Sequence, residues 1–247
     1  MDDAVYEVEN KIEATHWWFV GRRVLLRKIL DRIDRPKTSA VLDVGTGTGS
    51  NLRLLQELKY ERVSGVDFSD QAIRFCAKKG LPPVTKGDIC RLPFADDTFD
   101  IVLATDVIEH VDDDKAAVSE LFRTLKPGGV AIITVPAFQS LWGLQDEVSH
   151  HRRRYRQGPL RMLIREMGFQ ERTSFYFNYF LFAPIWLARQ IIRMSRIKLS
   201  SENQINGPVL NATLRSIFTL DVITAPILHP PFGVSLFMLA EKPKPPQ

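Results

Sequence analysis

Three glycines at alternating positions constrain the fold of this chain more than any other feature. Residues 40–44 form a short apolar run, residues 43–49 read DVGTGTG, and residues 50–55 resume the spacing of a helix. A strand, a glycine turn and a helix in this order predict the first unit of a parallel sheet, whose carboxyl edge is where such sheets bind ligands.

The same alternation continues along the chain. We predict further strands over residues 62–66, 83–86, 99–105 and 130–135, with helices over 70–79 and 115–125 between them. Strands separated by helices form right-handed crossovers, so the fold class is α/β with a doubly wound, mostly parallel sheet. The chain of 247 residues, 45% of them hydrophobic, suits a single domain.

Helical spacing also precedes and follows this alternation. We expect one or two helices over residues 7–33, ended by Pro36. After residue 136 we expect a long loop (137–156), a helix (159–167) and a strand (169–177). Mostly helix should follow over 179–227, before a last strand over 233–240. The Lys-Pro-Gly-Gly sequence at 126–129 is typical of a structural turn, and the tail at 242–246 is expected to fray.

Acidic side chains stand at the next two strand ends. Asp67 closes the second predicted strand, where a carboxylate can accept hydrogen bonds from two ribose hydroxyls, and Asp88 with Ile89 follows the third, where they suit an adenine edge. Together with the glycine turn they predict a nucleoside site. A dinucleotide fingerprint would need its third glycine at position 50, which is Ser50, so the spacing disfavours a nicotinamide cofactor.

Six motifs in the same order resemble the class I S-adenosylmethionine-dependent methyltransferases, in particular their small-molecule, type 11-like branch. They are DVGTGTG at 43–49, VD at 66–67, GDICRLPF at 87–94, FDIV at 99–102, IEHV at 108–111 and LKPGG at 125–129. The resemblance covers residues 38–136 well and the strands up to 240 in outline. It implies a Rossmann-like sheet of seven strands with the last antiparallel, and S-adenosylmethionine as cofactor.

The resemblance also implies a set of cofactor contacts. They are Gly45, Thr46, Gly47 and Gly49 for the methionine and ribose portion, Asp67 for the ribose hydroxyls, Phe68 for the adenine face, Asp88 and Ile89 for the adenine edge, and Thr105 or Asp106 near the methionine end. Trp17 belongs to an aromatic segment that forms either core or a lid over the sulfonium. Arg22 either pairs with the cofactor carboxylate or is a surface arginine.

We therefore expect one methyltransferase domain over residues 1–247. Within it, 1–37 is a helical N-terminal lid, 38–136 is the cofactor-binding core, and 137–247 is a substrate-side half with a helical insertion at about 179–228, before the last strand. The insertion is expected to cap the acceptor pocket.

Methyl transfer from a sulfonium depends mainly on positioning the acceptor and excluding water. For a hydroxyl acceptor, His110 is the first candidate base, with packing beside the cofactor as its other interpretation. Glu109 is either structural or functional. His150 and His151 are alternative bases on a loop, residues 150–156, whose arginines either grip an anionic or polyhydroxylated substrate or form a basic surface. No metal site is predicted, because adjacent histidines project apart and no third ligand is evident nearby.

The second half of the chain is basic, which suits either binding to nucleotides, phosphorylated substrates or an anionic membrane surface, or an ordinary solvated face. Residues 141–247 carry 14 Lys and Arg against 7 Asp and Glu, whereas residues 1–140 carry 19 against 22. The apolar stretch 175–188 is too short to span a bilayer, but Arg189, Arg193, Arg196 and Lys198 follow it at helical spacing. We expect peripheral membrane contact through residues 175–198, with core packing or a dimer interface as the alternatives.

The predicted function is methyl transfer from S-adenosylmethionine to a small-molecule, glycan or lipid-linked acceptor, at oxygen. The alternatives are a cofactor-binding protein without transfer activity and a nicotinamide-dependent oxidoreductase. Nucleic acid is not expected, because the sequence after the fourth strand, ATDV at 104–107, lacks the NPPY-type motif of amino-directed DNA enzymes. The acidic N-terminus shows no export signal and Cys76 and Cys90 suit reduced, structural roles, so a cytoplasmic location is expected.

Overall fold

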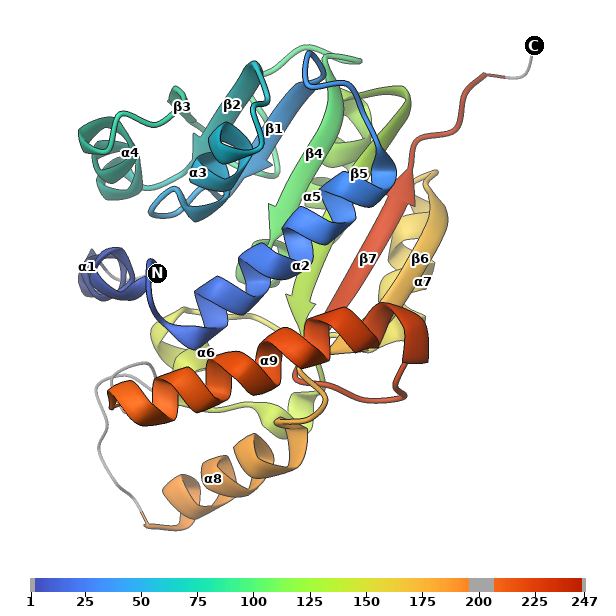
Figure 1. Ribbon diagram of the computed structural model, residues 1–247. Coiled ribbons are helices and arrows are strands. Elements are labelled where there is room, and N and C mark those ends of the chain that lie inside the picture. The colour runs from blue at the N-terminus through green and yellow to red at the C-terminus, as the bar shows by residue number, and fades with distance from the viewer. Residues whose placement is uncertain (1–2, 196–206, 246–247) are drawn as a thin grey trace.

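A central sheet organises the computed structural model, which describes residues 3–195 and 207–245 (Figure 1). Within these residues the sheet has seven strands: β1 (Ala40–Val44), β2 (Arg62–Asp67), β3 (Val84–Lys86), β4 (Phe99–Thr105), β5 (Leu125–Pro136), β6 (Gln170–Phe177) and β7 (Ser235–Glu241). Their order is β3-β2-β1-β4-β5-β7-β6, and β7 runs antiparallel to both of its neighbours. The predicted fold class, including the antiparallel last strand, is confirmed.

Helices cover both faces of the sheet. Those in the described residues are α1 (Asp3–Ile12), α2 (Trp17–Ile33), α3 (Ser50–Glu57), α4 (Asp70–Lys78), α5 (Asp114–Thr124), α6 (Leu144–Val148), α7 (Gln157–Glu166), α8 (Phe182–Ser195) and α9 (Pro208–Leu228), with short 3₁₀ turns at Ile108–His110 and Gln139–Leu141. Apolar side chains of α2, α3 and α9 share one core cluster with the sheet, and those of α5 and α7 share the other. The predicted alternation of strands and helices therefore corresponds to a sheet buried on both faces.

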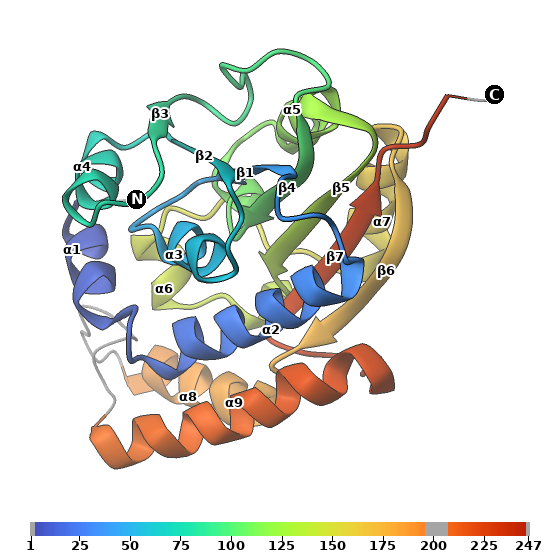
Figure 2. The same ribbon diagram turned by 45° about the horizontal axis from the view of Figure 1, so that its top comes forward.

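The N-terminal helices and the insertion meet on one face. Helix α2 packs against α9, and both views show the two helices side by side (Figure 2). Gly21 allows this approach, because a Cβ at that position would lie 2.1 Å from the ring of Phe218. Trp18 stacks on the same ring, with centroids 5.2 Å apart. The helical extension and the insertion, separate in sequence, thus form one layer.

Asp221 fixes the start of the insertion. Its buried carboxylate accepts hydrogen bonds from the backbone N–H groups of Asn178, Tyr179 and Phe180 at 2.6, 2.6 and 2.9 Å. Asn178 has a positive φ of 59°, so the chain turns sharply out of β6 here. The helix expected over 179–227 is present as α8 and α9, and residues 196–206 lie outside the described residues.

Three local predictions were wrong in detail. The loop expected over residues 137–156 contains α6, whose first turn closes when the N–H of Gly143 donates to Asp146 Oδ2 at 2.7 Å. The Lys-Pro-Gly-Gly turn lies inside β5, because residues 126–129 bulge out of the pairing between Phe99↔Leu125 and Ile101↔Val130. Pattern alone does not separate a turn before a strand from a bulge within it.

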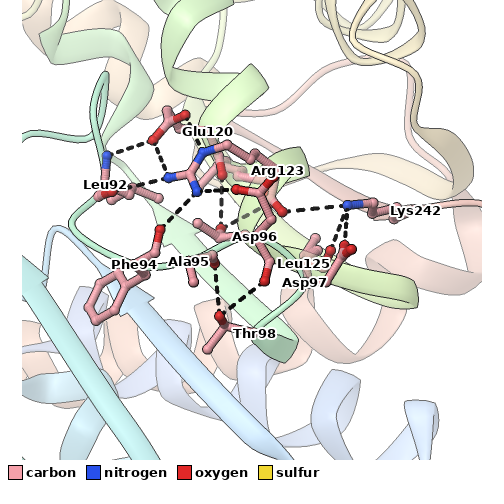
Figure 3. A network of polar contacts seen from close by, with 12 residues as sticks. Leu92, Phe94, Ala95, Asp96, Asp97, Thr98, Glu120, Arg123, Leu125 and Lys242 are labelled. Carbon is pink, nitrogen blue, oxygen red and sulfur yellow. Dashed lines mark hydrogen bonds and ion pairs between the residues drawn. The ribbon is translucent and has the colours of Figure 1, made fainter.

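The third correction concerns the tail. Lys242 Nζ contacts Asp97 at 2.7 Å and the carbonyl of Leu125 at 2.8 Å (Figure 3), so the chain is anchored at this position instead of frayed. In the same network Arg123 pairs with Glu120 and Asp96 and reaches the carbonyl oxygens of the 92–94 segment. These contacts tie the segment that follows β3 to α5.

Candidate cofactor and acceptor site

A cavity of about 810 Å³ opens at the carboxyl edge of the sheet. The last residues of four parallel strands line it: Val44 of β1, Asp67 of β2, Thr105 of β4 and Pro136 of β5. Helices α1, α2, α8 and α9 supply further walls, together with the segments around residues 106–111 and 145–154. The cavity therefore lies where a doubly wound sheet places its ligand, and it extends from the sheet to the insertion.

The glycine turn forms the floor of the cavity. Gly45 and Gly47 line it with positive φ angles of 67° and 55°. A Cβ on Gly45 would lie 2.4 Å from Val107, whereas one on Gly47 would meet no atom within 4 Å. Gly49 is not among the lining residues and instead precedes α3, where a Cβ would lie 2.2 Å from Leu81. The backbone at Gly47 thus borders open space that a ligand can fill.

Asp67 and Phe68 stand beside this turn. Asp67 Oδ2 accepts the N–H of Gly47 and Oδ1 accepts that of Ser69, both at 2.8 Å. Burial raises the pKa of Asp67, although these backbone hydrogen bonds oppose the rise. Each carboxylate oxygen has a second lone pair, so both can still accept hydroxyl donors. The ring of Phe68 lines the cavity and is 75% exposed, which suits stacking on a flat heterocycle.

Asp88 and Ile89 form the neighbouring wall. Asp88 Oδ1 accepts the N–H of Cys90 at 2.9 Å, which fixes the carboxylate, and Ile89 is buried at 7% exposure while still lining the cavity. The structure therefore brings the predicted contacts of three strand ends to one cavity. Their donors, acceptors and aromatic face fit an adenosine, and the open floor at Gly47 leaves room for it.

Asn51 connects two strands beside the glycine turn, and the sequence analysis did not identify it. Its Nδ2 donates to Asp43 Oδ1 and to Thr105 Oγ1, both at 2.9 Å, and so joins β1 to β4. Asp43 is fully buried, and burial raises its pKa to about 7. The available signal was a polar residue directly after the glycine turn, in the first turn of α3.

Arg22 and Asp106 form an ion pair at 2.7 Å across the cavity wall, with side-chain exposures of 12% and 21%. Thr134 Oγ1 also donates to Asp106, at 3.2 Å. The interpretation of Arg22 as a surface arginine is therefore wrong, because the side chain is largely buried and turned towards the sheet. Contact with a cofactor carboxylate stays a proposal.

The N-terminal segment is attached to the glycine turn. Glu13 is buried, accepts a hydrogen bond from Thr48 Oγ1, and pairs with Lys79 Nζ at 2.6 Å. Trp17 lines the cavity and also packs edge-to-face on Phe218 at 5.3 Å. Trp17 therefore packs in the core and also borders the cavity, and its role as a lid over the sulfonium stays a proposal. No motif at Glu13 could have revealed its role in advance.

Two of the three predicted histidines lie together. His110 and His151 line the cavity with ring centroids 4.7 Å apart, whereas His150 is exposed and is not among the lining residues. Burial, and then the neighbouring His151, lowers the pKa of His110 to about 4, so its ring is neutral. The loop thus directs only its second histidine inwards.

Asp146 holds His151 in place. Its Oδ1 lies 2.8 Å from His151 Nδ1, and Arg154 pairs with both carboxylate oxygens at 2.8 and 2.9 Å. Burial opposes ionisation, but the hydrogen bonds from His151 and Arg154 lower the pKa of Asp146 to about 2. Arg154 is therefore the loop arginine that lines the cavity, and its charge is directed at Asp146.

Glu109 completes this group. The side chain is fully buried, lines the cavity, and neither carboxylate oxygen accepts a hydrogen bond from the described residues. Burial raises its pKa well above the ordinary value, and repulsion from Asp106 adds to the rise. The sequence argument that the paired histidines lack further ligands nearby was incomplete, because Glu109 and His110 reach His151 from a distant segment.

The insertion supplies an apolar wall opposite the glycine turn. Leu181, Pro184, Ile185 and Ala188 of the α8 region and Leu210 and Leu214 of α9 line the cavity. The membrane interpretation needs one correction, since Arg189 is 9% exposed and lies 3.9 Å from Asp146 instead of facing outwards. Arg196 and Lys198 lie outside the described residues. Among the described helices, none has the length and apolar composition needed to cross a bilayer.

Comparison with known proteins agrees with this geometry. Residues 42–133 match the family described as methyltransferase domain. A demethylmenaquinone methyltransferase of Streptomyces avermitilis is 39% identical over 114 residues, covering 45% of this chain and 48% of the relative. A ubiquinone/menaquinone biosynthesis C-methyltransferase of Desulfotalea psychrophila is 32% identical over 151 residues, covering 57% and 59%. The chain thus spans about half the length of these curated relatives.

Solved structures share the fold. A chain from the complex of a Haloferax volcanii methyltransferase activator with a methyltransferase superposes with a TM-score of 0.66 at 20% identity, covering 99% of this chain and 97% of that one. A Haemonchus contortus phosphoethanolamine N-methyltransferase in complex with S-adenosylmethionine gives 0.58 at 22% identity, covering 88% and 52%. The family match over residues 42–133, the strand order and the site together support a class I S-adenosylmethionine-dependent methyltransferase domain.

Proposed function

We propose that this protein transfers the methyl group of S-adenosylmethionine to a small apolar or lipid-linked acceptor. The observation that carries the proposal is Asp67, bonded to Gly47 at the carboxyl edge of the sheet with Phe68 exposed beside it. When bound, S-adenosylmethionine supplies an electrophilic methyl group. The chain's own residues would hold the nucleoside, position the acceptor and exclude water.

Cofactor binding would use the three strand ends. Asp67 would accept the ribose hydroxyls, Phe68 would cover one face of the adenine, and Asp88 with Ile89 would meet its edge. The backbone at Gly45 and Gly47, with Thr46, would border the methionine portion, and Thr105, Asp106, Arg22 and Trp17 would surround its end. Gly49 would act indirectly, by starting α3.

The acceptor would lie between the histidines and the insertion. The leucine, isoleucine and proline side chains of this wall favour an apolar acceptor over a glycan. The Streptomyces relative is named for demethylmenaquinone, and a sterol 24-C-methyltransferase of Schizosaccharomyces pombe is 37% identical over 99 residues, so apolar acceptors occur among the relatives. Methylation at oxygen, with His110 or His151 receiving the proton, is our proposal. Methylation at carbon is the competing outcome.

Membrane contact through the insertion would deliver such an acceptor. Several large apolar side chains of the insertion are exposed: Phe180, Trp186, Leu187 and Ile191 in the α8 region and Val209, Leu210, Leu220, Ile223, Ile227 and Leu228 in α9. Both helices also contribute to the apolar wall of the cavity. The insertion thus has apolar side chains towards solvent and towards the cavity, an arrangement that suits peripheral contact with a lipid surface.

Binding without transfer is the alternative. A [4+2]-cyclase also has this fold, with a TM-score of 0.60 at 20% identity, so the fold alone does not specify methyl transfer. The family match and the relatives' names favour methyl transfer, and they give the nicotinamide alternative no support. A turnover measurement decides between methyl transfer and cofactor binding without transfer.

The binding test compares two aspartates near one another. Calorimetry with S-adenosylhomocysteine should show at least tenfold weaker binding for Asp67→Ala, because two charge-assisted hydrogen bonds are lost. Asp70→Ala is the matched control, since Asp70 is exposed and pairs with Lys86 on the surface. Equal affinity of wild type and Asp67→Ala would overturn the proposed site.

The transfer test supplies radiolabelled S-adenosylmethionine with demethylated quinones, sterols and soluble glycans. Label should enter an apolar acceptor, and analysis of the product identifies the methylated atom. Binding of S-adenosylhomocysteine without any transfer in an extract of cellular lipids would instead support the alternative.

A further inference from the structure

We propose that Glu109, His110 and His151 form a binding site for a divalent transition-metal ion at the acceptor end of the cavity. One potential ligand atom of each residue lies within 4.8 Å of the other two. A metal ion with bonds of about 2.0–2.2 Å to nitrogen and oxygen holds neighbouring ligands about 3–4 Å apart, so small side-chain movements close the site.

The carboxylate of Glu109 provides the first independent argument. It is fully buried, and neither oxygen has a hydrogen-bond partner among the described residues. A buried carboxyl group without a partner costs free energy unless it is protonated or meets a cation. The charge of Arg154 lowers the pKa of Glu109 in part, but the guanidinium of Arg154 pairs with Asp146, and Arg22 pairs with Asp106. A bound divalent cation would balance the negative charge of the Glu109 carboxylate.

The histidines are held as metal ligands usually are. His151 Nδ1 contacts the carboxylate of Asp146 at 2.8 Å, which leaves Nε2 as the nitrogen available for a metal. His110 makes a hydrogen bond to the backbone of Ser149, which fixes its ring beside His151. Metal-binding histidines typically have their other ring nitrogen fixed by a carboxylate or a carbonyl group.

The donor set indicates the class of metal. Two imidazoles and one carboxylate suit Zn²⁺, Mn²⁺ or Fe²⁺ better than Ca²⁺ or Mg²⁺, which prefer oxygen ligands. Three protein ligands leave at least one coordination position open, and all three residues line the cavity. That position would be available to an oxygen of the acceptor.

This inference rests on the proposed function only for the role of the metal. A bound metal would orient a hydroxyl group of the acceptor and make that hydroxyl more acidic than in water. Because His110 and His151 would then be metal ligands, neither would receive the proton, which would pass to solvent instead. The acceptor would then be an apolar molecule that carries a hydroxyl group. Metal binding itself requires neither cofactor nor turnover.

The test measures metal binding to the full chain after removal of metals with a chelator. Calorimetry with ZnCl₂, and electron paramagnetic resonance with MnCl₂, should show saturable binding of one ion. Glu109→Gln and His151→Asn should each weaken the affinity at least tenfold, because each removes one ligand. His150→Asn is the matched control, since His150 is the exposed neighbour and asparagine tolerates its φ of 56°.

Folding and cofactor binding are checked separately. Every variant should keep the circular dichroism spectrum of the wild type and its affinity for S-adenosylhomocysteine, so that loss of metal reports on ligands alone. The proposal is overturned if the wild type binds neither ion, or if His150→Asn weakens binding as much as Glu109→Gln does. Failure of the S-adenosylhomocysteine experiment would refute the proposed function and leave the metal result standing.

Discussion

Buried ionisable side chains concentrate around the cavity, and His16 shows how one of them links pH to stability. His16 caps α2, where its side chain accepts a hydrogen bond from the N–H of Trp18 at 3.3 Å. The residue is 6% exposed, and burial lowers its pKa from 6.5 to about 4. A protonated ring would be charged inside the fold and would lose the cap.

This depressed pKa predicts a loss of stability in mild acid. The unfolded chain binds the proton near pH 6.5 and the folded chain only near pH 4. Protonation of His16 therefore leaves stability unchanged above pH 6.5 and lowers it progressively as the pH falls from 6.5 towards 4. His16→Asn keeps a capping side chain that does not titrate. Relative to pH 7, the variant should retain roughly 2 kcal/mol more unfolding free energy than wild type at pH 4.5.

Urea unfolding at pH 7.0, 5.5 and 4.5 measures this difference. Other titrating groups, including His110, are present in both proteins and cancel in the comparison. Parallel pH dependence of the two proteins would contradict the assignment to His16.

Among single residues, the sequence predicted those that line the cavity better than those that support it. Gly47, Asp67 and Asp88 were predictable because each follows a strand in a recurrent motif. Glu13 and Asn51 were not, because their partners are chosen by tertiary packing and no local pattern marks them. His151 was named as a candidate, but its grouping with Glu109 depends on how the loop returns to the sheet.

The junction between β6 and α8 depends on one side chain of another element. Asp221 of α9 accepts three backbone hydrogen bonds from the chain that leaves β6, and its carboxylate is fully buried. The acid thus replaces a capping residue within α8 itself. Its position explains why the insertion stays joined to the sheet although two chain segments build it.

We predict that Asp221→Ala lowers the unfolding free energy by roughly 2–4 kcal/mol, because three backbone donors lose their acceptor. Asp221→Asn keeps one carbonyl oxygen and should cost less. Urea denaturation of both variants measures the difference. An alanine variant as stable as the asparagine variant would show that the backbone donors find other partners.

Elements with strong periodicity were predicted well, and those set by context were not. Strands β1 and β4 are mostly apolar and almost completely buried, as parallel strands covered on both faces require. Helix α6 has only five residues, which is too short for its periodicity to be recognised. The bulge in β5 depends on its partner β4, which no single segment specifies.

The molecule as a whole presents apolar side chains on the insertion. The full chain should therefore bind vesicles of anionic lipid at low salt in a co-sedimentation assay. Trp186→Glu combined with Leu187→Glu should weaken that binding at least tenfold, because the two side chains are 41% and 54% exposed. Each would contribute roughly half of the ~1.5–3 kcal/mol that full burial of a large apolar side chain supplies, and each glutamate would add repulsion from anionic lipid.

Met162→Glu provides the control, since Met162 is 65% exposed on α7, away from the insertion. If the wild type stays in the supernatant with anionic vesicles, membrane contact is refuted. If Met162→Glu weakens binding as much as the double variant, the contact lies elsewhere.

The position of β7 has a consequence for synthesis of the protein. The last strand to leave the ribosome is inserted between β5 and β6, which were made earlier and do not pair with each other. Until residues 235–241 emerge, the nascent chain carries two open strand edges, a form prone to aggregate. Completion of the sheet therefore waits for β7, and a chain that terminates before β7 keeps both strand edges open.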